Sequence, residues 1–113
     1  MTAKKILVID DSRLKRQTYA VILARHYLFY ASNGREAIDW LRDHPDIDFV
    51  LLNEGPFDTE GFFFELRALG NAPPVIAVTL PSQTGTIDGA DAIIELPFDE
   101  EQLLAKIEKL PRH

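Results

Sequence analysis

The sequence contains no cysteine and only three histidines. The lack of cysteine excludes disulfide scaffolds, cysteine-based zinc sites, iron–sulfur clusters and thiol catalysis. The histidines, His26, His44 and His113, are scattered and do not pair at the spacing that metal ligands need. We therefore expect a fold held by a hydrophobic core, without a histidine-rich metal site.

Basic residues and long apolar runs are also scarce. The 12 Lys and Arg residues against 18 Asp and Glu give a net charge of −6, which argues against nucleic-acid binding through phosphates. The longest apolar run, Tyr19 to Ala24, is far shorter than the roughly 20 residues of a membrane helix. The basic residues at the start of the sequence are followed by an apolar run that is too short for a signal peptide. We expect a native start at Met1, a cytoplasmic setting, and no nucleic-acid or membrane partner.

The 113 residues, 46% of them hydrophobic, suit one domain over 1–113. Short apolar runs alternate with amphipathic segments. The runs predict strands at 6–9, 28–31, 49–52, 75–78 and 92–95, and helices follow near 13–25, 35–43, 59–69 and 100–110. In the first helix a mostly apolar face is formed at helical spacing by Leu14, Thr18, Val21, Ile22 and Arg25. This alternation predicts a parallel sheet with both faces covered, whose working site lies at the carboxyl ends of the strands.

Several segments, in this order and spacing, resemble the CheY-like receiver domains of bacterial two-component signalling. They are Lys5-Ile-Leu-Val-Ile-Asp-Asp-Ser12, Ala31-Ser-Asn-Gly-Arg-Glu-Ala37, His44-Pro-Asp-Ile-Asp-Phe-Val-Leu-Leu52, Gly89-Ala-Asp91 and Leu96-Pro-Phe98. The resemblance covers nearly the whole chain. It implies a flavodoxin-like, doubly wound α/β fold with a five-stranded parallel sheet of order 2-1-3-4-5.

The resemblance also implies a phosphorylation site at the strand ends. The acidic pair that holds Mg²⁺ in the family matches Asp10 and Asp11, and the phosphate-binding Thr matches Thr79. The phosphoacceptor Asp is replaced by Asn53, and the Lys before the fifth-strand Pro is replaced by Leu96. An amide has no anionic oxygen to attack phosphorus. We therefore predict a vestigial site, in which losing one acid and one base together leaves the charge of the pocket unchanged.

The metal site of the family is expected to be weakened. Asp11, Asp10 through a water, the Asn53 side-chain oxygen and the Gly55 carbonyl still form a hard oxygen set. Losing one anionic ligand lowers its affinity, so Mg²⁺ binding is expected to be weak or absent and no other cofactor is implied. We expect Asn53 to hydrogen-bond the acidic pair, and we interpret the basic residues 13, 15 and 16 as a solvated face.

The family's output surface is also altered. The segment 81–89 is poor in helix formers, so we expect the fourth helix to be shortened or missing. An exposed Phe63 beside Phe57, with Ile93 at the aromatic switch position, would form an apolar partner surface. The alternative is that the Phe63 ring folds over the shortened loop.

These features predict a pseudo-receiver. We expect no enzyme activity, and phosphorylation-independent binding to a histidine kinase or another two-component protein, with a homodimer as a further partner arrangement. Three alternatives remain open. They are a working phosphoreceiver that uses Asp10, Asp11 or Glu54 as a surrogate acceptor, a small-ligand sensor at the strand ends, and an oligomerisation module.

Overall fold

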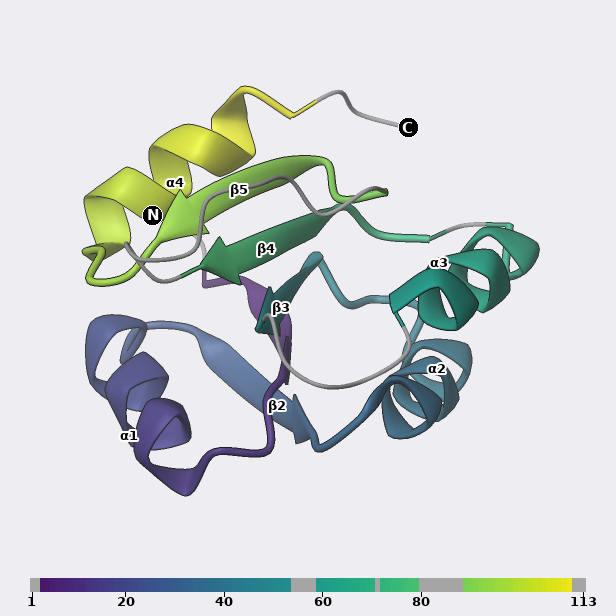
Figure 1. Ribbon diagram of the computed structural model, residues 1–113. Coiled ribbons are helices and arrows are strands. Elements are labelled where there is room, and N and C mark those ends of the chain that lie inside the picture. The colour runs from purple at the N-terminus through teal and green to yellow at the C-terminus, as the bar shows by residue number, and fades with distance from the viewer. Residues whose placement is uncertain (1–2, 54–58, 71, 80–88, 111–113) are drawn as a thin grey trace.

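A five-stranded parallel sheet runs through the centre of the structure (Figure 1). The computed structural model describes residues 3–53, 59–70, 72–79 and 89–110. The strands are β1 (Lys5–Ile9), β2 (Tyr27–Ala31), β3 (Phe49–Asn53), β4 (Val75–Thr79) and β5 (Ala92–Glu95). The helices are α1 (Arg13–Ile22), α2 (Gly34–Asp43), α3 (Thr59–Ala68) and α4 (Glu100–Glu108). The strand order is β2-β1-β3-β4-β5, as the sequence predicts.

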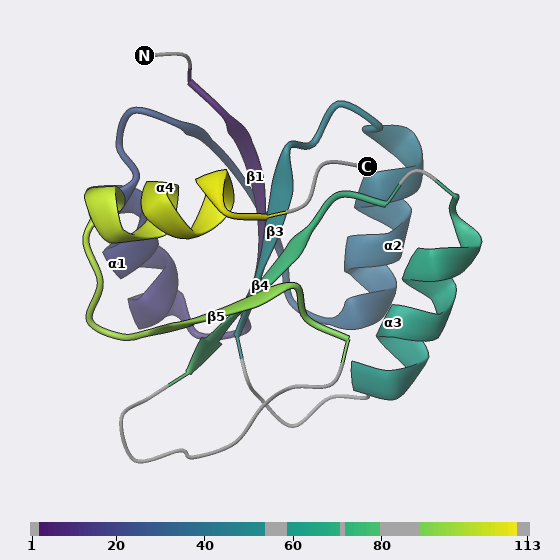
Figure 2. The ribbon, with the colours of Figure 1, turned by 90° about the horizontal axis from the view of Figure 1, so that it is seen from above.

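Helices cover both faces of the sheet. Seen from above in Figure 2, α1 and α4 lie on one side of the sheet and α2 and α3 on the other. Side chains of a strand alternate between the faces, so each apolar run supplies two cores. In β1, Leu7 and Ile9 belong to the core under α2 and α3, whereas Ile6 and Val8 belong to the core under α1 and α4. The central strands β1, β3 and β4 are apolar along most of their length because both faces of the sheet are covered there.

Helix α1 buries a different face from the one its apolar spacing indicates. Ser12 caps the helix by accepting a hydrogen bond from the backbone N–H of Lys15. Tyr19 is fully buried, whereas Leu14 and Val21 are 73% and 79% exposed. The sheet thus receives the Tyr19 side of the helix. Of the expected face, Leu14, Thr18 and Val21 lie in solvent, whereas Ile22 packs against the core under α1 and α4.

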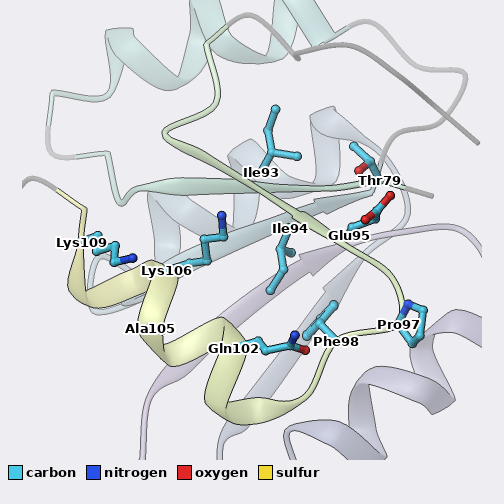
Figure 3. Close-up of a pocket in the computed structure, with 10 residues that line it drawn as sticks. All are labelled: Thr79, Ile93, Ile94, Glu95, Pro97, Phe98, Gln102, Ala105, Lys106 and Lys109. Atoms are coloured by element: carbon cyan, nitrogen blue, oxygen red, sulfur yellow. The ribbon is translucent and has the colours of Figure 1, made fainter. Parts of the chain in front are cut away.

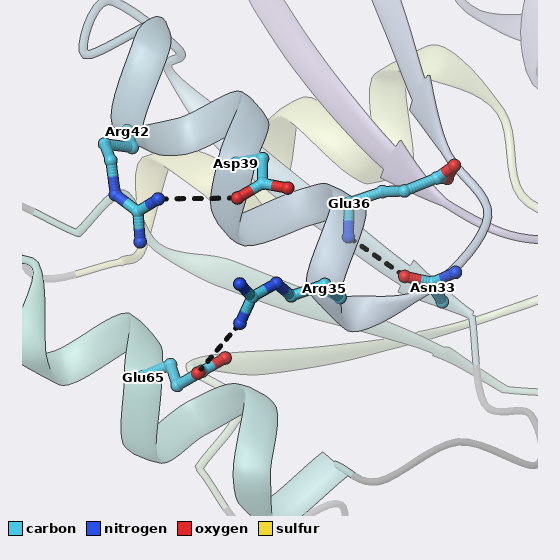
Figure 4. Close-up of polar contacts among 6 residues, drawn as sticks. All are labelled: Asn33, Arg35, Glu36, Asp39, Arg42 and Glu65. Carbon is cyan, nitrogen blue, oxygen red and sulfur yellow. Dashed lines mark hydrogen bonds and ion pairs between the residues drawn. The ribbon is translucent and has the colours of Figure 1, made fainter.

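Helices α2 and α3 are joined by close packing and an ion pair (Figure 4). Asn33 caps α2 by accepting from the Glu36 backbone N–H at 2.9 Å. A Cβ on Gly34 would lie only 3.2 Å from the Phe62 Cβ, so glycine allows α3 to approach the start of α2. At the surface Arg35 lies 3.8 Å from Glu65 of α3.

The predicted fold class is confirmed by the strand order and by the alternation of strands and helices. The stretch 80–88, where we expect the fourth helix to be shortened or missing, lies outside the described residues. Among the helices of the described ranges, none has the length and apolar character needed to cross a membrane.

Candidate functional site at the strand ends

The sheet places Asp10 and Asn53 on adjacent strands at its carboxyl edge. Ile9 pairs with Leu52, so the next residue of each chain segment, Asp10 and Asn53, lies at the same level. Both side chains are largely buried, with 3% of Asp10 and 9% of Asn53 exposed. The predicted neighbourhood of these two positions is therefore present in the structure.

Asp10 is a buried carboxylate with one satisfied oxygen. Its Oδ1 accepts a hydrogen bond of 2.7 Å from the backbone N–H of Ser12, while its Oδ2 is buried and has no hydrogen-bond partner among the described residues. Burial raises the pKa of Asp10, and the Ser12 N–H and the charge of Lys15 partly oppose that rise. Asp11, the second member of the acidic pair, is exposed. The two acids therefore occupy different environments.

Asn53 is bonded by a lysine from α1. The Lys15 ammonium donates to Asn53 Oδ1 at 3.2 Å, across 38 positions of the sequence. Asn53 makes no hydrogen bond with Asp10 or Asp11 within the described part of the chain, so the expected contact with the acidic pair is wrong.

Arg16, in the same turn of α1, bonds to the residues that directly follow β1 and β2. Its Nε donates to the Asp10 carbonyl at 2.8 Å and its Nη2 donates to Ser32 Oγ at 3.0 Å. Its guanidinium also lies over the Tyr30 ring, 5.2 Å from the centroid. Lys15 and Arg16 are therefore part of the site rather than of a solvated face. The sequence contained a signal for this role of the two residues. Basic residues in the first turn of a helix oppose its dipole, so acidic groups are expected near them.

The donor set can be tested against the Mg²⁺ ion that the receiver resemblance implies. Mg²⁺ takes oxygen ligands in a close octahedral arrangement. The free Asp10 Oδ2 suits such an ion, but the Asn53 oxygen already accepts from an ammonium group. Gly55 lies outside the described residues, and the described ranges contain no group of three or more His, Cys, Asp or Glu able to hold a metal. The described residues do not fit the ion as they are arranged.

The other two site positions lie on the β4–β5 side of the edge. Thr79 ends β4 with 6% of its surface exposed, and its carbonyl accepts from the Leu96 backbone N–H at 2.8 Å. Leu96 follows β5, precedes a cis peptide bond to Pro97, and packs at the border of the core under α1 and α4. Leucine offers no charge to this half of the site, as the sequence predicts.

A groove of about 650 Å³ lies between β5 and α4 (Figure 3). Thr79 lines one end, Ile93 lines the β5 side, and the lining also includes Lys106 of α4 and Lys109, which caps the end of that helix. The groove therefore combines apolar and basic groups next to the Thr79 half of the site.

The expected partner surface of Phe57, Phe63 and Ile93 is not present in that form. Phe63 is 4% exposed, so its predicted exposure is wrong and the alternative of a folded-in ring holds. Gly89, at φ 100°, lets the chain pass so close that a Cβ there would lie 2.9 Å from Phe63 Cγ. Phe64 is the exposed ring, at 77%. Phe57 and the loop residues Glu54 and Gly55 lie outside the described residues.

Comparisons with known proteins agree with this fold. No model of a protein family matches the sequence. The response regulator MprA of Mycolicibacterium vanbaalenii is 30% identical over 116 residues, covering 96% of this chain and 50% of that protein. The probable transcriptional regulator ycf27 of Porphyridium aerugineum is 31% identical over 119 residues, covering 99% and 50%. The crystal structure of the chemotaxis response regulator CheY4 of Vibrio cholerae superposes with a TM-score of 0.75 at 25% identity, covering 96% of this chain and 98% of that one.

The sheet order and these similarities define the class of fold: the chain has the doubly wound fold of CheY-like receiver domains, and its sequence is similar to those of response regulators. It spans about half the length of the curated relatives it matches. A particular feature of this chain is the amide Asn53 at the end of β3, bonded by Lys15.

Proposed function

We propose that this domain is a pseudo-receiver, which acts in two-component signalling through protein contacts and without phosphorylation. The observation that carries the proposal is Asn53 at the end of β3. Its side-chain oxygen accepts a hydrogen bond from the Lys15 ammonium. An acyl phosphate requires an anionic carboxylate at that place. Leu96 supplies no cation on the opposite side for a phosphoryl group. On this proposal the domain has no enzyme activity, and its cytoplasmic setting stays a prediction.

The groove between β5 and α4 is the surface we assign to the partner. It retains Ile93 from the predicted surface and adds Lys106 and Lys109, with Glu95 as an acidic group at its edge. A partner segment with apolar and acidic side chains matches this lining. The partner we propose is a histidine kinase or another two-component protein, and a second copy of this domain is the competing arrangement.

The test is exposure of the domain to a small acyl-phosphate donor with Mg²⁺, followed by intact mass and an amide NMR spectrum. We expect no mass gain and no shifts at Asp11, Asn53 or Thr79. The matched variant Asn53→Asp with Leu96→Lys restores both missing groups and reports whether the donor conditions suffice. A gain of one phosphoryl group by the parent would refute the proposal and favour a surrogate acceptor among Asp10, Asp11 and Glu54.

A further inference from the structure

The first turn of α1 has an unusual charge pattern for a helix start. It carries Arg13, Lys15 and Arg16 and no acidic residue. The N-terminal end of a helix dipole is positive, so cations there are unfavourable unless other groups compensate. Two of these three cations are compensated by the strand-end site, since Lys15 donates to Asn53 and Arg16 donates to the Asp10 carbonyl.

The charge of the Lys15 ammonium also acts on a buried carboxylate, that of Asp10. Asp10 is buried, its Oδ2 accepts no hydrogen bond from the residues that the structure describes, and a buried carboxylate without a countercharge is costly. The positive charges that act on Asp10 are those of Lys15 and Arg16, and each of them lowers its pKa against the effect of burial. The site therefore contains its own cations, both tethered to α1.

We propose that the Lys15 ammonium is the resident cation of the strand-end site, and that it excludes Mg²⁺ by occupying Asn53 and opposing a second positive ion beside Asp10 and Asp11. The inference rests on the proposed function in one respect only, because both treat the site as free of phosphoryl chemistry. It adds a cause: the metal is kept out by a lysine of this chain and not solely by the loss of an acidic ligand.

The physical basis is competition for the same oxygens. Mg²⁺ holds its ligands at about 2.0–2.1 Å and needs lone pairs that face it. While Lys15 donates to Asn53 Oδ1, that oxygen would face two cations at once, and the repulsion between ammonium and Mg²⁺ is strong in a partly buried site. Removing the ammonium while keeping the aliphatic stem should release the oxygen and the charge together.

The experiment compares Lys15→Met with the parent by titrating Mg²⁺ into each protein and following the amide NMR signals of Asp11 and Asn53, with no phosphoryl donor present. The parent is expected to show no saturable shifts at low millimolar Mg²⁺. Lys15→Met is expected to show saturable shifts and an affinity at least about tenfold higher. Arg13→Met is the matched control, because it removes the same charge from the same turn at an exposed position and should behave as the parent does.

Further variants decide the remaining cases. Lys15→Met combined with Asp10→Asn should lose the gained affinity, which locates the ion. If Lys15→Met does not fold, as its amide spectrum would show, Lys15→Gln takes its place. Equal Mg²⁺ affinity in the parent and the Lys15 variants, whether tight or undetectable, would overturn the proposal. Phosphorylation of the parent would instead refute the proposed function and leave the order of these affinities unchanged.

Discussion

The two halves of the sheet's carboxyl edge are held in different ways. Around β1 and β3, side chains of α1 reach into the edge, with Lys15 bonded to Asn53 and Arg16 bonded to the Asp10 carbonyl. Around β4 and β5, the described contact across the edge is a backbone bond from Leu96 to Thr79, and Leu96 adds apolar packing. The first half is held by hydrogen bonds from charged side chains. The second half adjoins the groove between β5 and α4.

The difference lies in the contacts that the lysines make. In the first half Lys15 of α1 bonds to Asn53, beside the buried Asp10. In the second half Leu96 is apolar, and the nearby lysines, Lys106 and Lys109, line the groove. A lysine thus makes a hydrogen bond within the domain on one side of the edge, and the lysines on the other side are exposed. The following predictions test that contrast, beginning with the largest expected effect.

Restoring the acceptor acid while removing Lys15 should destabilise the domain most. Asn53→Asp alone places a carboxylate within reach of the Lys15 ammonium and forms an ion pair, so we expect little loss. Adding Lys15→Met leaves that carboxylate beside Asp10 without its partner, which should lower the free energy of unfolding by about 2–4 kcal/mol at neutral pH. Urea denaturation measures this loss.

The control for that variant is Asn53→Asp with Arg13→Met, which has the same net charge but keeps Lys15. Crowding raises the folded-state pKa of the new carboxyl group, so the loss should shrink as the pH falls through that pKa. Equal stability of the two double variants at neutral pH would show that Lys15 does not compensate the acids.

The strands could be predicted from the sequence because burial on both faces leaves a continuous apolar run, whereas the sheet order came from the family resemblance. The run at 92–95, for example, matches β5 (Ala92–Glu95) residue for residue. The buried face of α1 could not be chosen in the same way. Apolar residues lie on both sides of this helix, and the sheet receives the side with Tyr19 and leaves Leu14 and Val21 exposed.

The positions of the candidate site were predictable, but its contacts were not. Asp10 follows β1, Asn53 and Thr79 end β3 and β4, and parallel strands bring their ends to one edge. The partner of Asn53 is separated from it by 38 positions, and no spacing rule indicates that a lysine side chain would reach it. The burial of Phe63 likewise depends on the distant Gly89, whose close approach is a tertiary feature.

Removing the buried charge of Asp10 should stabilise the domain. Burial raises the folded-state pKa of Asp10 above its ordinary value of 3.8, so the ionised carboxylate costs stability at neutral pH. Asp10→Asn keeps an acceptor for the Ser12 N–H and removes the charge. We expect a gain of about 1 kcal/mol at neutral pH by urea denaturation.

The pH dependence provides the check on Asp10. As the pH falls through the raised pKa, folded Asp10 takes up a proton before the unfolded chain does, and the advantage of Asp10→Asn should disappear. Asp11→Asn, at an exposed position, serves as the control and should leave stability nearly unchanged. A less stable Asp10→Asn at neutral pH would mean that the cations of α1 outweigh the cost of burial.

The smallest change in stability is expected in the other half of the edge, where the lysines are free of ion pairs with described residues. Lys106 and Lys109 are exposed, so Lys106→Glu with Lys109→Glu should alter the free energy of unfolding by no more than about 0.5 kcal/mol. Lys15→Met, which removes a charged hydrogen bond in the first half, should cost about 1 kcal/mol. Urea denaturation of the two variants side by side measures the contrast. If changing Lys106 and Lys109 lowers the free energy of unfolding as much as Lys15→Met does, these two lysines stabilise the fold as Lys15 does. That result would contradict the assignment of the groove to a partner.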